Sequence, residues 1–189
     1  MTDRARLRRH AERAVPEEAA DILGQARIAH VGFVQDGQPF VIPFLFDYSA
    51  DEAPDRIYLH GAHASRALRH LANGAAVCVE ATLLDGLVYS RAAEMHSANY
   101  RSVVCFGLCC ELQDEAAKRH VMDRLTRRYF AGRTLGRDYD AVTSEYLRTT
   151  TVLEVQVEEW SAKARRGGPL GPRDADPSAP GTAGVVELT

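Results

Sequence analysis

The stretch IYLHGAHASRALRHL, residues 57–71, decides how the rest of this chain is interpreted. Its first residues, 57–59, are apolar and have the character of a β-strand, which ends in a bend of small residues at Gly61. Ser65 then opens a helical pattern in which two leucines lie three residues apart. The stretch therefore predicts a strand, a tight turn and a short helix in direct succession.

A strand followed directly by a helix N-terminus is suited to binding an anion. The first backbone N–H groups of a helix lack partners within the helix and carry a partial positive charge. Ser65 is a good capping residue, and Arg66 and Arg69 add two full positive charges to the first turn. The turn is therefore a candidate phosphate site. The alternative is an ordinary strand-to-helix turn whose arginines are solvated.

The composition fits one globular domain. Of the 189 residues, 46% are hydrophobic and 26% are charged, and the net charge of −3 gives no general attraction to nucleic acid or anionic membranes. No run approaches the roughly 18–20 apolar residues that a membrane-spanning helix needs. The basic start of the chain leads into Glu12, Glu17 and Glu18 rather than an apolar segment. We therefore expect no secretory signal, a cytoplasmic location, and no membrane or nucleic-acid partner.

The four cysteines lack the spacing of a zinc site. They are Cys78, Cys105, Cys109 and Cys110, and they contain no C-x2-C pair. Successive residues of a strand point to opposite faces, so Cys109 and Cys110 would not bind one metal ion. We expect reduced thiols buried in strands, and no bound metal.

Three segments are expected along the chain. Residues 1–25 have the pattern of an N-terminal helical segment, and residues 26–166 contain the strand-like runs of the main domain. Residues 167–189 form a tail rich in Gly and Pro, which we expect to be loop or partly disordered.

A β-hairpin opens the main domain. Two strand-like runs, 26–34 and 39–48, flank Asp36-Gly37, a dipeptide typical of tight hairpin turns. Pro43 lies within the second run and has no N–H to donate to a neighbouring strand. The second strand is therefore expected at an edge, at a bulge, or where a ligand meets the backbone.

The remaining pattern predicts a mainly antiparallel barrel. Asp85-Gly86 indicates another tight turn, residues 101–112 are apolar at both parities, and residues 149–157 alternate like a half-buried strand. A helix is predicted over 114–130, where apolar residues recur at spacing four. Many short strands with few helices indicate a barrel. A doubly wound sheet would need a helix between nearly all strands, and the sequence has no Gly-x-Gly-x-x-Gly or Walker motif.

Two further segments are unusually polar for strand boundaries. Residues 96–104 read HSANYRSVV and precede the most apolar strand, and residues 160–169 read WSAKARRGGP and are cationic. Buried polar groups need partners, so such density at a strand entry needs an explanation. Each segment is either a plain strand boundary or part of a ligand site.

Taken together and in order, these stretches resemble the pyridoxamine 5'-phosphate oxidase-like family of FMN-binding split barrels. In particular, they resemble its branch of flavin-nucleotide-binding proteins related to nitroimidazole-resistance reductases. The segments that carry the resemblance are 28–33 (IAHVGF), 41–44 (VIPF), 57–61 (IYLHG), Ser65-Arg66, 85–88 (DGLV), 96–104 (HSANYRSVV) and 161–163 (SAK).

The resemblance implies a mainly β fold, namely a six-stranded antiparallel split β-barrel over residues 26–166. It also implies a homodimer with two FMN sites at the subunit interface. The cofactor-binding residues that it implies are Val41, Ile42, Pro43 and Phe44 for the flavin ring, His60, Gly61, Ser65 and Arg66 for the phosphate, and Tyr100, Arg101, Ser102 and Lys163 for closing the site. Physical chemistry agrees, because FMN carries a dianionic phosphate and an apolar ring. Arg101 or Lys163 could supply a cation near flavin N1.

The expected function is that of an FMN-dependent oxidoreductase, which takes hydride from a nicotinamide nucleotide and passes electrons to a small acceptor. No catalytic residue is assigned. The chain departs from true pyridoxamine phosphate oxidases, because Ala67 replaces the basic residue after Ser65-Arg66 and their C-terminal Arg-x-His motif is absent from the sequence. Vitamin B6 synthesis is therefore not expected.

Two alternatives remain open. One is a non-catalytic flavin-binding or stress-related protein. The other is a haem-binding relative in which a histidine serves as axial ligand of the iron. The histidines considered for that role are His60, His63, His70 and His96.

The apolar run after Arg101 predicts a flavin site shared between two subunits. Val103 and Cys105 have one parity in this run, and a second apolar set has the other. That second set is Phe106, Leu108 and Leu112. One set can face the barrel interior, whereas the other needs a partner surface. We expect the turn at Ser65 from one chain to meet residues 100–102 of the other.

Overall fold

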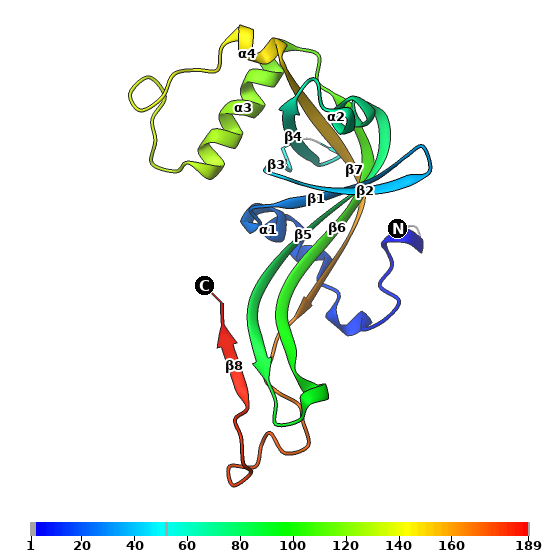
Figure 1. The fold of residues 1–189 in the computed structure, drawn as a ribbon, viewed down its shortest axis with the longest axis vertical. Coiled ribbons are helices and arrows are strands. Elements are labelled where there is room, and N and C mark those ends of the chain that lie inside the picture. Colours follow the sequence, from blue (N-terminus) through cyan, green and yellow to red (C-terminus); the bar gives the residue numbers. More distant parts are fainter. Residues whose placement is uncertain (1–2, 52, 189) are drawn as a thin grey trace.

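The computed structural model describes residues 3–51 and 53–188, and its centre is an antiparallel sheet that curls into a split β-barrel (Figure 1). The strands are β1 (Ala29–Gln35), β2 (Gln38–Phe44), β3 (Phe46–Ser49), β4 (Arg56–Ala62), β5 (Asn73–Tyr89), β6 (Ser97–Glu111), β7 (Thr150–Arg165) and β8 (Gly184–Glu187). Their order in the sheet is β2-β1-β5-β6-β7-β4-β3, and β8 pairs with β5. The predicted mainly β class is therefore confirmed.

Helices cover the barrel and its ends. The α-helices are α1 (Ala19–Gln25), α2 (Arg66–Leu71), α3 (Glu115–Tyr129) and α4 (Ser144–Arg148), and the short 3-10 helices are η1 (Asp3–Ala5), η2 (Ala11–Arg13), η3 (Pro16–Glu18) and η4 (Ala93–Met95). The long predicted helix is α3, and Asp114 caps it by accepting a hydrogen bond from Ala117 N at 2.7 Å. No helix of the described residues is both long enough and apolar enough to cross a membrane.

The described sheet has eight strands rather than the expected six. The run 39–48 is divided at Leu45 into β2 and β3, because β2 pairs with β1 whereas β3 pairs with β4. The tail supplies β8, which pairs with Gly86–Tyr89 of β5. The expectation of a tail without regular structure is therefore wrong for residues 184–187.

The β1–β2 hairpin is confirmed. Asp36 and Gly37 both have positive φ, 52° and 76°, as a two-residue type I′ hairpin turn requires. Among the described residues β2 pairs only with β1, so its other edge is free. Pro43 is tolerated there because an edge strand needs fewer N–H donors.

The turn predicted at Asp85-Gly86 is wrong. Strand β5 runs through this position in continuous pairing with β6, and the register shifts by one residue between Leu84 and Gly86, as in a β-bulge. A Cβ added at Gly86 would lie 3.0 Å from the carbonyl oxygen of Val186. The glycine therefore serves the close approach of β8, not a change of chain direction.

The inner face of the sheet forms the core. Val103, Cys105 and Cys109 of β6 are fully buried, whereas Phe106 is only half-buried and Leu108 is 46% exposed. The predicted division of this strand into two faces is confirmed for these residues. Leu112 does not share the outer face, because it lies beyond β6 and packs against the cluster under α3. Cys109 and Cys110 lie on opposite faces, and burial raises the pKa of Cys109 to about 12.

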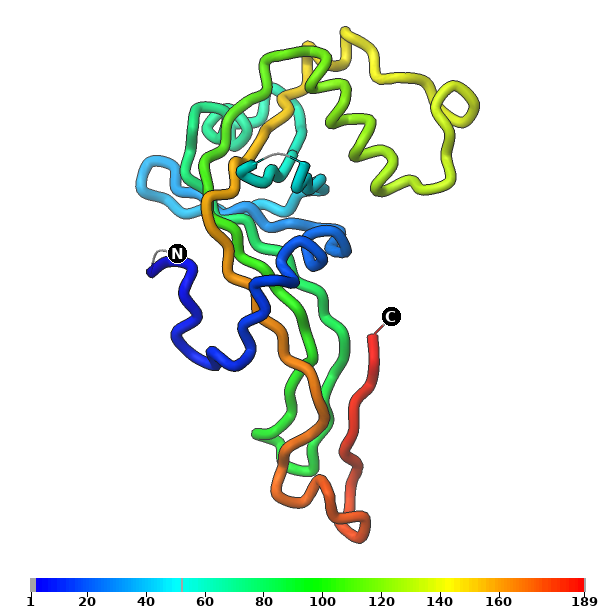
Figure 2. Tube along the Cα trace, turned by 180° about the vertical axis from the view of Figure 1, so that it is seen from behind, coloured from blue at the N-terminus to red at the C-terminus, as the bar shows by residue number. Residues whose placement is uncertain are grey.

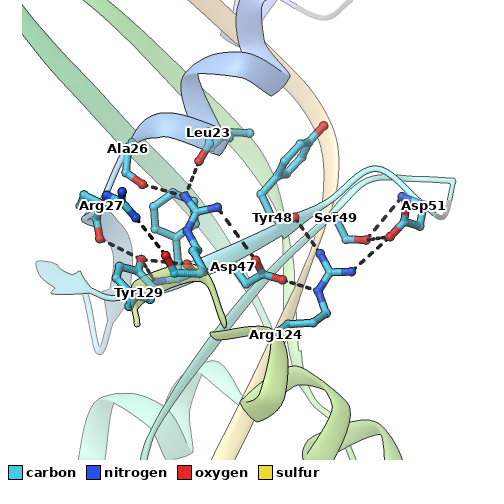
Figure 3. Close-up of polar contacts among 11 residues, drawn as sticks. Leu23, Ala26, Arg27, Asp47, Tyr48, Ser49, Asp51, Arg124 and Tyr129 are labelled. Atoms are coloured by element: carbon cyan, nitrogen blue, oxygen red, sulfur yellow. Dashed lines mark hydrogen bonds and ion pairs between the residues drawn. The ribbon is translucent and has the colours of Figure 1, made fainter. Parts of the chain in front are cut away.

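Arginines of α3 attach this helix to the barrel (Figure 3). Arg124 donates to the carboxylates of Asp47 and Asp51 and to the carbonyl of Tyr48. Arg128 donates to the carbonyls of Leu23 and Ala26, at 2.6 and 2.7 Å. These carbonyls belong to the end of α1, where helical carbonyls lack partners within the helix. The contacts thus hold α3, β3 and α1 together.

Beyond the barrel, β5, β6 and the end of β7 extend as a long arm, and β8 lies beside β5 (Figures 1 and 2). Asp174 fastens the tail to the tip of this arm. Its carboxylate accepts hydrogen bonds from Ser90 Oγ at 3.1 Å, Arg91 N at 2.8 Å and Gly171 N at 2.7 Å. The arm is therefore an ordered part of the sheet.

Candidate functional site

The predicted strand, turn and helix at residues 57–71 are confirmed. Strand β4 leads into α2, and Ser65 is its N-cap, with Oγ accepting from Leu68 N at 3.5 Å. A Cβ added at Gly61 would lie 2.7 Å from Leu68 Cδ1. Gly61 therefore allows α2 to pack closely against the end of β4.

Arg66 brings this turn next to β2. Its guanidinium carbon lies 4.8 Å from the centre of the Phe40 ring, a cation–π contact. Phe40 stacks on Phe33 of β1 with ring centres 5.4 Å apart. Two of the predicted parts of the flavin site, the phosphate turn and the edge strand, therefore lie side by side in one chain.

The four predicted ring-binding residues of β2 do not share one face. Ile42 and Phe44 pack against the barrel core, whereas Val41 and Pro43 are exposed. Successive residues of a strand alternate between faces, which explains the division. Only Val41 and Pro43 therefore offer side chains on the outer face.

This outer surface, which we call the platform, continues across β1 and β5. Val41 is aligned with Gly32 and Cys78, and Pro43 is aligned with His30 and Glu80. Gly32 has no side chain, so nothing projects from β1 between Val41 and Cys78. This gap leaves room for a planar ring, with apolar groups on one side and polar groups on the other. His30 and Glu80 were not among the predicted site residues, although strand alternation places His30 outward with Pro43.

His60 lies on the far side of the turn and borders a cavity of about 770 Å³. Its Nδ1 is buried and has no hydrogen-bond partner among the described residues. Burial lowers the pKa of His60, so the charged imidazolium that would bind phosphate is disfavoured. The neutral form is the form that binds metals. The phosphate role of His60 stays a prediction, in which a neutral imidazole rather than an imidazolium would contact the phosphate.

Other polar groups line the same cavity. His63 Nδ1 lies 3.1 Å from Thr151 Oγ1, and Arg69, Arg148 and Tyr146 complete the wall. Tyr146 and Arg148 belong to α4, about 80 residues from the turn. This wall could not be predicted from the sequence, because no local pattern connects α4 to residues 60–69.

Arg101 is engaged within its own chain. Its Nε and Nη2 donate to the two carboxylate oxygens of Asp85 at 3.0 and 2.7 Å, and Nη1 donates to Gln25 Oε1 at 2.9 Å. The hydrogen bonds to Asp85 raise the pKa of Arg101 further above its usual value. Of the two cations considered for flavin N1, Arg101 is thus already paired.

Ser102 and Lys163 face each other across β6 and β7, in the row that contains Thr82. No ion pair involves Lys163 within residues 3–51 and 53–188. Tyr100 is aligned with Arg165, two residues further along the arm than the Ser102–Lys163 pair. Ser102 lies four residues from Phe106, which shares a row with Gly32, so along the strand Ser102 is about 14 Å from that row at 3.4 Å per residue, and it also lies two strands away from Gly32. One chain therefore does not bring Arg66 and residues 100–102 into a single pocket.

A second cavity, of about 800 Å³, lies between α3, α4 and the segment 135–142. Met122, Leu135, Val142 and Tyr146 give it a mostly apolar lining. It contains none of the site residues predicted from the sequence. Tyr146 borders both this cavity and the one beside His60.

Three solved structures show what this chain is similar to. The flavocytochrome Anf3 from Azotobacter vinelandii is 31% identical, with 100% of this chain and 85% of that chain covered and a TM-score of 0.83. The FAD and heme binding protein from Mycobacterium smegmatis is 37% identical, with 93% and 82% covered and a TM-score of 0.79. A candidate 5-nitroimidazole antibiotic resistance protein from Bacteroides thetaiotaomicron is 25% identical, with 80% and 86% covered and a TM-score of 0.64.

No curated protein matches the chain. The family model of pyridoxamine 5'-phosphate oxidase matches residues 16–164, a span that contains every site residue predicted from the sequence. The two structures above 30% identity cover nearly the whole chain, so the agreement is not confined to the barrel. On this match, the chain belongs to the pyridoxamine 5'-phosphate oxidase family.

Proposed function

We propose that the protein binds a flavin at the free edge of β2, with the ring against the platform and the phosphate at Ser65 and Arg66. The observation that carries this proposal is the 4.8 Å contact of Arg66 with Phe40, because it sets a cation beside the free edge of β2. Phe40 is aligned with the buried Phe33 and belongs to the inner face, so a flavin with its phosphate at Arg66 would pass around the edge of β2 to reach the platform on the outer face. The flavoproteins named above, at 31% and 37% identity, support it.

We propose FMN as the cofactor, because the turn offers its hydroxyl and cation to a terminal phosphate. FAD has no terminal phosphate, although one similar protein is an FAD-binding protein. The test is to titrate the purified protein with FMN, FAD and riboflavin and to follow the flavin absorbance and fluorescence. FMN should bind most tightly. Equal affinity for FMN and riboflavin would contradict a phosphate site, and preference for FAD would replace FMN.

The flavin would serve an oxidoreductase that takes hydride from a nicotinamide nucleotide and delivers electrons to a small acceptor. The flavin supplies the redox chemistry when bound, and the protein orients it and adjusts its charge environment. Lys163 is the cation that we assign to this role, because Arg101 is paired with Asp85. Anaerobic mixing of the flavin-loaded protein with NADH or NADPH tests the proposal. Absence of flavin bleaching with either would favour the non-catalytic alternative or another electron donor.

We also propose a homodimer with shared flavin sites. The half-buried Phe106 and the 46% exposed Leu108 on the outer face of β6 need a cover, since obligate interfaces are built from such apolar surface. A second chain would also bring Ser102 and Lys163 to a site that one chain leaves incomplete.

A second candidate function is haem binding in the cavity beside His60. Burial lowers the pKa of His60 and so fits a neutral imidazole ligand to iron; because Nδ1 is buried, Nε2 is the nitrogen that would bind the iron. Arg69 and Arg148 could pair with the haem propionates. Two proteins with at least 31% identity are a flavocytochrome and a heme binding protein. Haem titration should give a Soret band that His60→Ala alters more than His63→Ala does. An unchanged band in both variants would contradict this site.

A further inference from the structure

Three polar side chains on the platform have no part in the function proposed so far. His30 of β1 is aligned with Glu80 of β5, and His30 Nδ1 lies 3.3 Å from Glu80 Oε2. The other carboxylate oxygen, Glu80 Oε1, accepts a hydrogen bond from Thr82 Oγ1. Thr82, Glu80 and His30 thus form a chain of contacts that crosses two strands of the outer face.

This chain of contacts defines the state of the imidazole. A carboxylate accepts but does not donate, so this contact is favourable when the proton is on His30 Nδ1, which would leave Nε2 to accept a proton. Thr82 restrains Glu80 from the other side. The His30 side chain is 50% exposed and that of Glu80 is 34% exposed, so protons from solvent can reach the pair. The arrangement is that of an oriented proton acceptor.

His30 lies next to the part of the platform on which a flavin ring would bind. His30 lies directly across from Pro43, and on the same strand it is two residues from Gly32, the centre of the platform. Directly opposed side chains of antiparallel strands lie about 5 Å apart at Cβ. A ring seated over Gly32 and Val41 would therefore have the His30 imidazole at its border.

We infer that His30, oriented by Glu80, takes up a proton when a flavin on the platform is reduced. The inference rests on the proposed flavin site. Two electrons and one proton convert the oxidised flavin to the hydroquinone anion, with the proton on N5. A second proton from solvent binds His30 Nε2, and the resulting imidazolium lies between the Glu80 carboxylate and the anionic ring. Reduction then consumes two protons for two electrons, although the flavin itself keeps only one.

The charges around His30 decide where this uptake occurs on the pH scale. Strand β5 presents Glu80 and the Cys78 thiol to it, and β2 presents only Pro43 and Val41, which are uncharged. Further across the sheet, Lys163 and Glu159 have opposite charges and lie in the rows on either side of the row that contains Glu80. Glu80 is the one carboxylate in contact with His30 among the described residues, so it is the charged group that would lie nearest to the imidazolium.

Potentiometric titration of the flavin-loaded full-length protein tests this inference. The flavin is reduced with dithionite against a reference dye at pH values between about 6 and 8, and the slope of the midpoint potential against pH gives the proton count. The wild type should show two protons per two electrons over the pH range in which His30 is neutral beside the oxidised flavin and charged beside the reduced flavin, and one proton outside that range. His30→Gln should show one throughout, and Glu80→Gln should alter the range over which two protons are taken up.

His10→Gln is the matched control, because His10 also contacts a glutamate, Glu12, at 3.0 Å but belongs to the N-terminal segment. It should behave like the wild type. A wild-type slope of one proton throughout, or an unchanged slope in His30→Gln, would overturn the inference. If His30→Gln lost its flavin, an unchanged profile in Glu80→Gln would overturn it. Failure of the wild type to bind flavin would instead contradict the proposed function, and absorbance reveals that before any titration.

Discussion

At the scale of single residues, Arg66 is the cation on which the phosphate site depends. Its contact with Phe40 orients the guanidinium, and a charge-assisted hydrogen bond contributes about 1.5–3 kcal/mol. We expect Arg66→Ala to weaken FMN binding about tenfold or more, as measured by fluorescence titration. Arg137→Ala is the control, because Arg137 is exposed and pairs with Asp138 far from this turn. Unchanged affinity in Arg66→Ala would move the phosphate elsewhere.

His60 should make stability depend on pH. Burial lowers its folded-state pKa below that of the unfolded chain, so below about pH 6.5 the unfolded state binds a proton that the folded state does not. This contribution to stability is complete above that pH and is lost as the pH falls further. We expect urea midpoints to fall less between about pH 7 and 5 in His60→Gln than in the wild type. Equal pH dependence of the two would contradict a buried, neutral His60.

Contacts between residues that are far apart in the sequence could not be predicted at this scale. Ser65 was identifiable as a cap and Arg66 as a cation from their local pattern alone. The pairing of Arg101 with Asp85 and Gln25 was not, because it joins β6, β5 and α1. An arginine in a polar segment resembles a ligand contact until its acidic partner is located.

At the scale of elements, the dipeptide Asp-Gly forms a turn at one position of this chain and a bulge at another. Asp36-Gly37 turns the chain, and both residues have positive φ. Asp85-Gly86 instead forms a bulge inside β5, because β6 continues to pair beyond it and β8 approaches on the other edge. Turn chemistry is local, whereas strand pairing is decided by the neighbours that the fold supplies.

Gly107 should be the glycine of the sheet whose replacement is tolerated least. It lies where the register of β6 and β7 shifts, and an added Cβ would be 2.0 Å from the carbonyl oxygen of Gln156. We expect Gly107→Ala to lower the free energy of unfolding by about 1–3 kcal/mol or more, measured with urea. Gly24→Ala in α1 is the control, because an added Cβ meets nothing within 4 Å, and alanine favours a helix. Equal stability of both variants would contradict this close approach.

At the scale of the whole molecule, the proposed shared site can be tested by complementation. Arg66→Ala and Lys163→Ala should each weaken FMN binding at both sites of a homodimer. Mixed dimers should regain one intact site of two, because one chain keeps Arg66 and the other keeps Lys163. FMN titration of refolded mixtures measures this recovery. No recovery in confirmed heterodimers would place both residues in a site within one chain.

The sequence predicted the barrel class because alternation, hairpin turns and the long amphipathic helix are local signals. It did not predict the division of β2 into a core-facing pair, Ile42 and Phe44, and an outward pair, Val41 and Pro43, as a constraint on the ring site. It also did not predict the cavity beside His60, which depends on α4. Surfaces built from distant segments appear only once the sheet order is known.

The attachment of the tail to the arm also limits strand pairing between two copies of the protein. Strand β8 covers the edge of β5 over Gly86–Tyr89, and that stretch includes the exposed Leu87 and Tyr89. An uncovered edge offers free N–H and C=O groups to any strand that reaches it. A chain shortened before residue 184 would present such an edge at the tip of a projecting arm. We therefore expect β8 to reduce strand exchange and edge-to-edge aggregation.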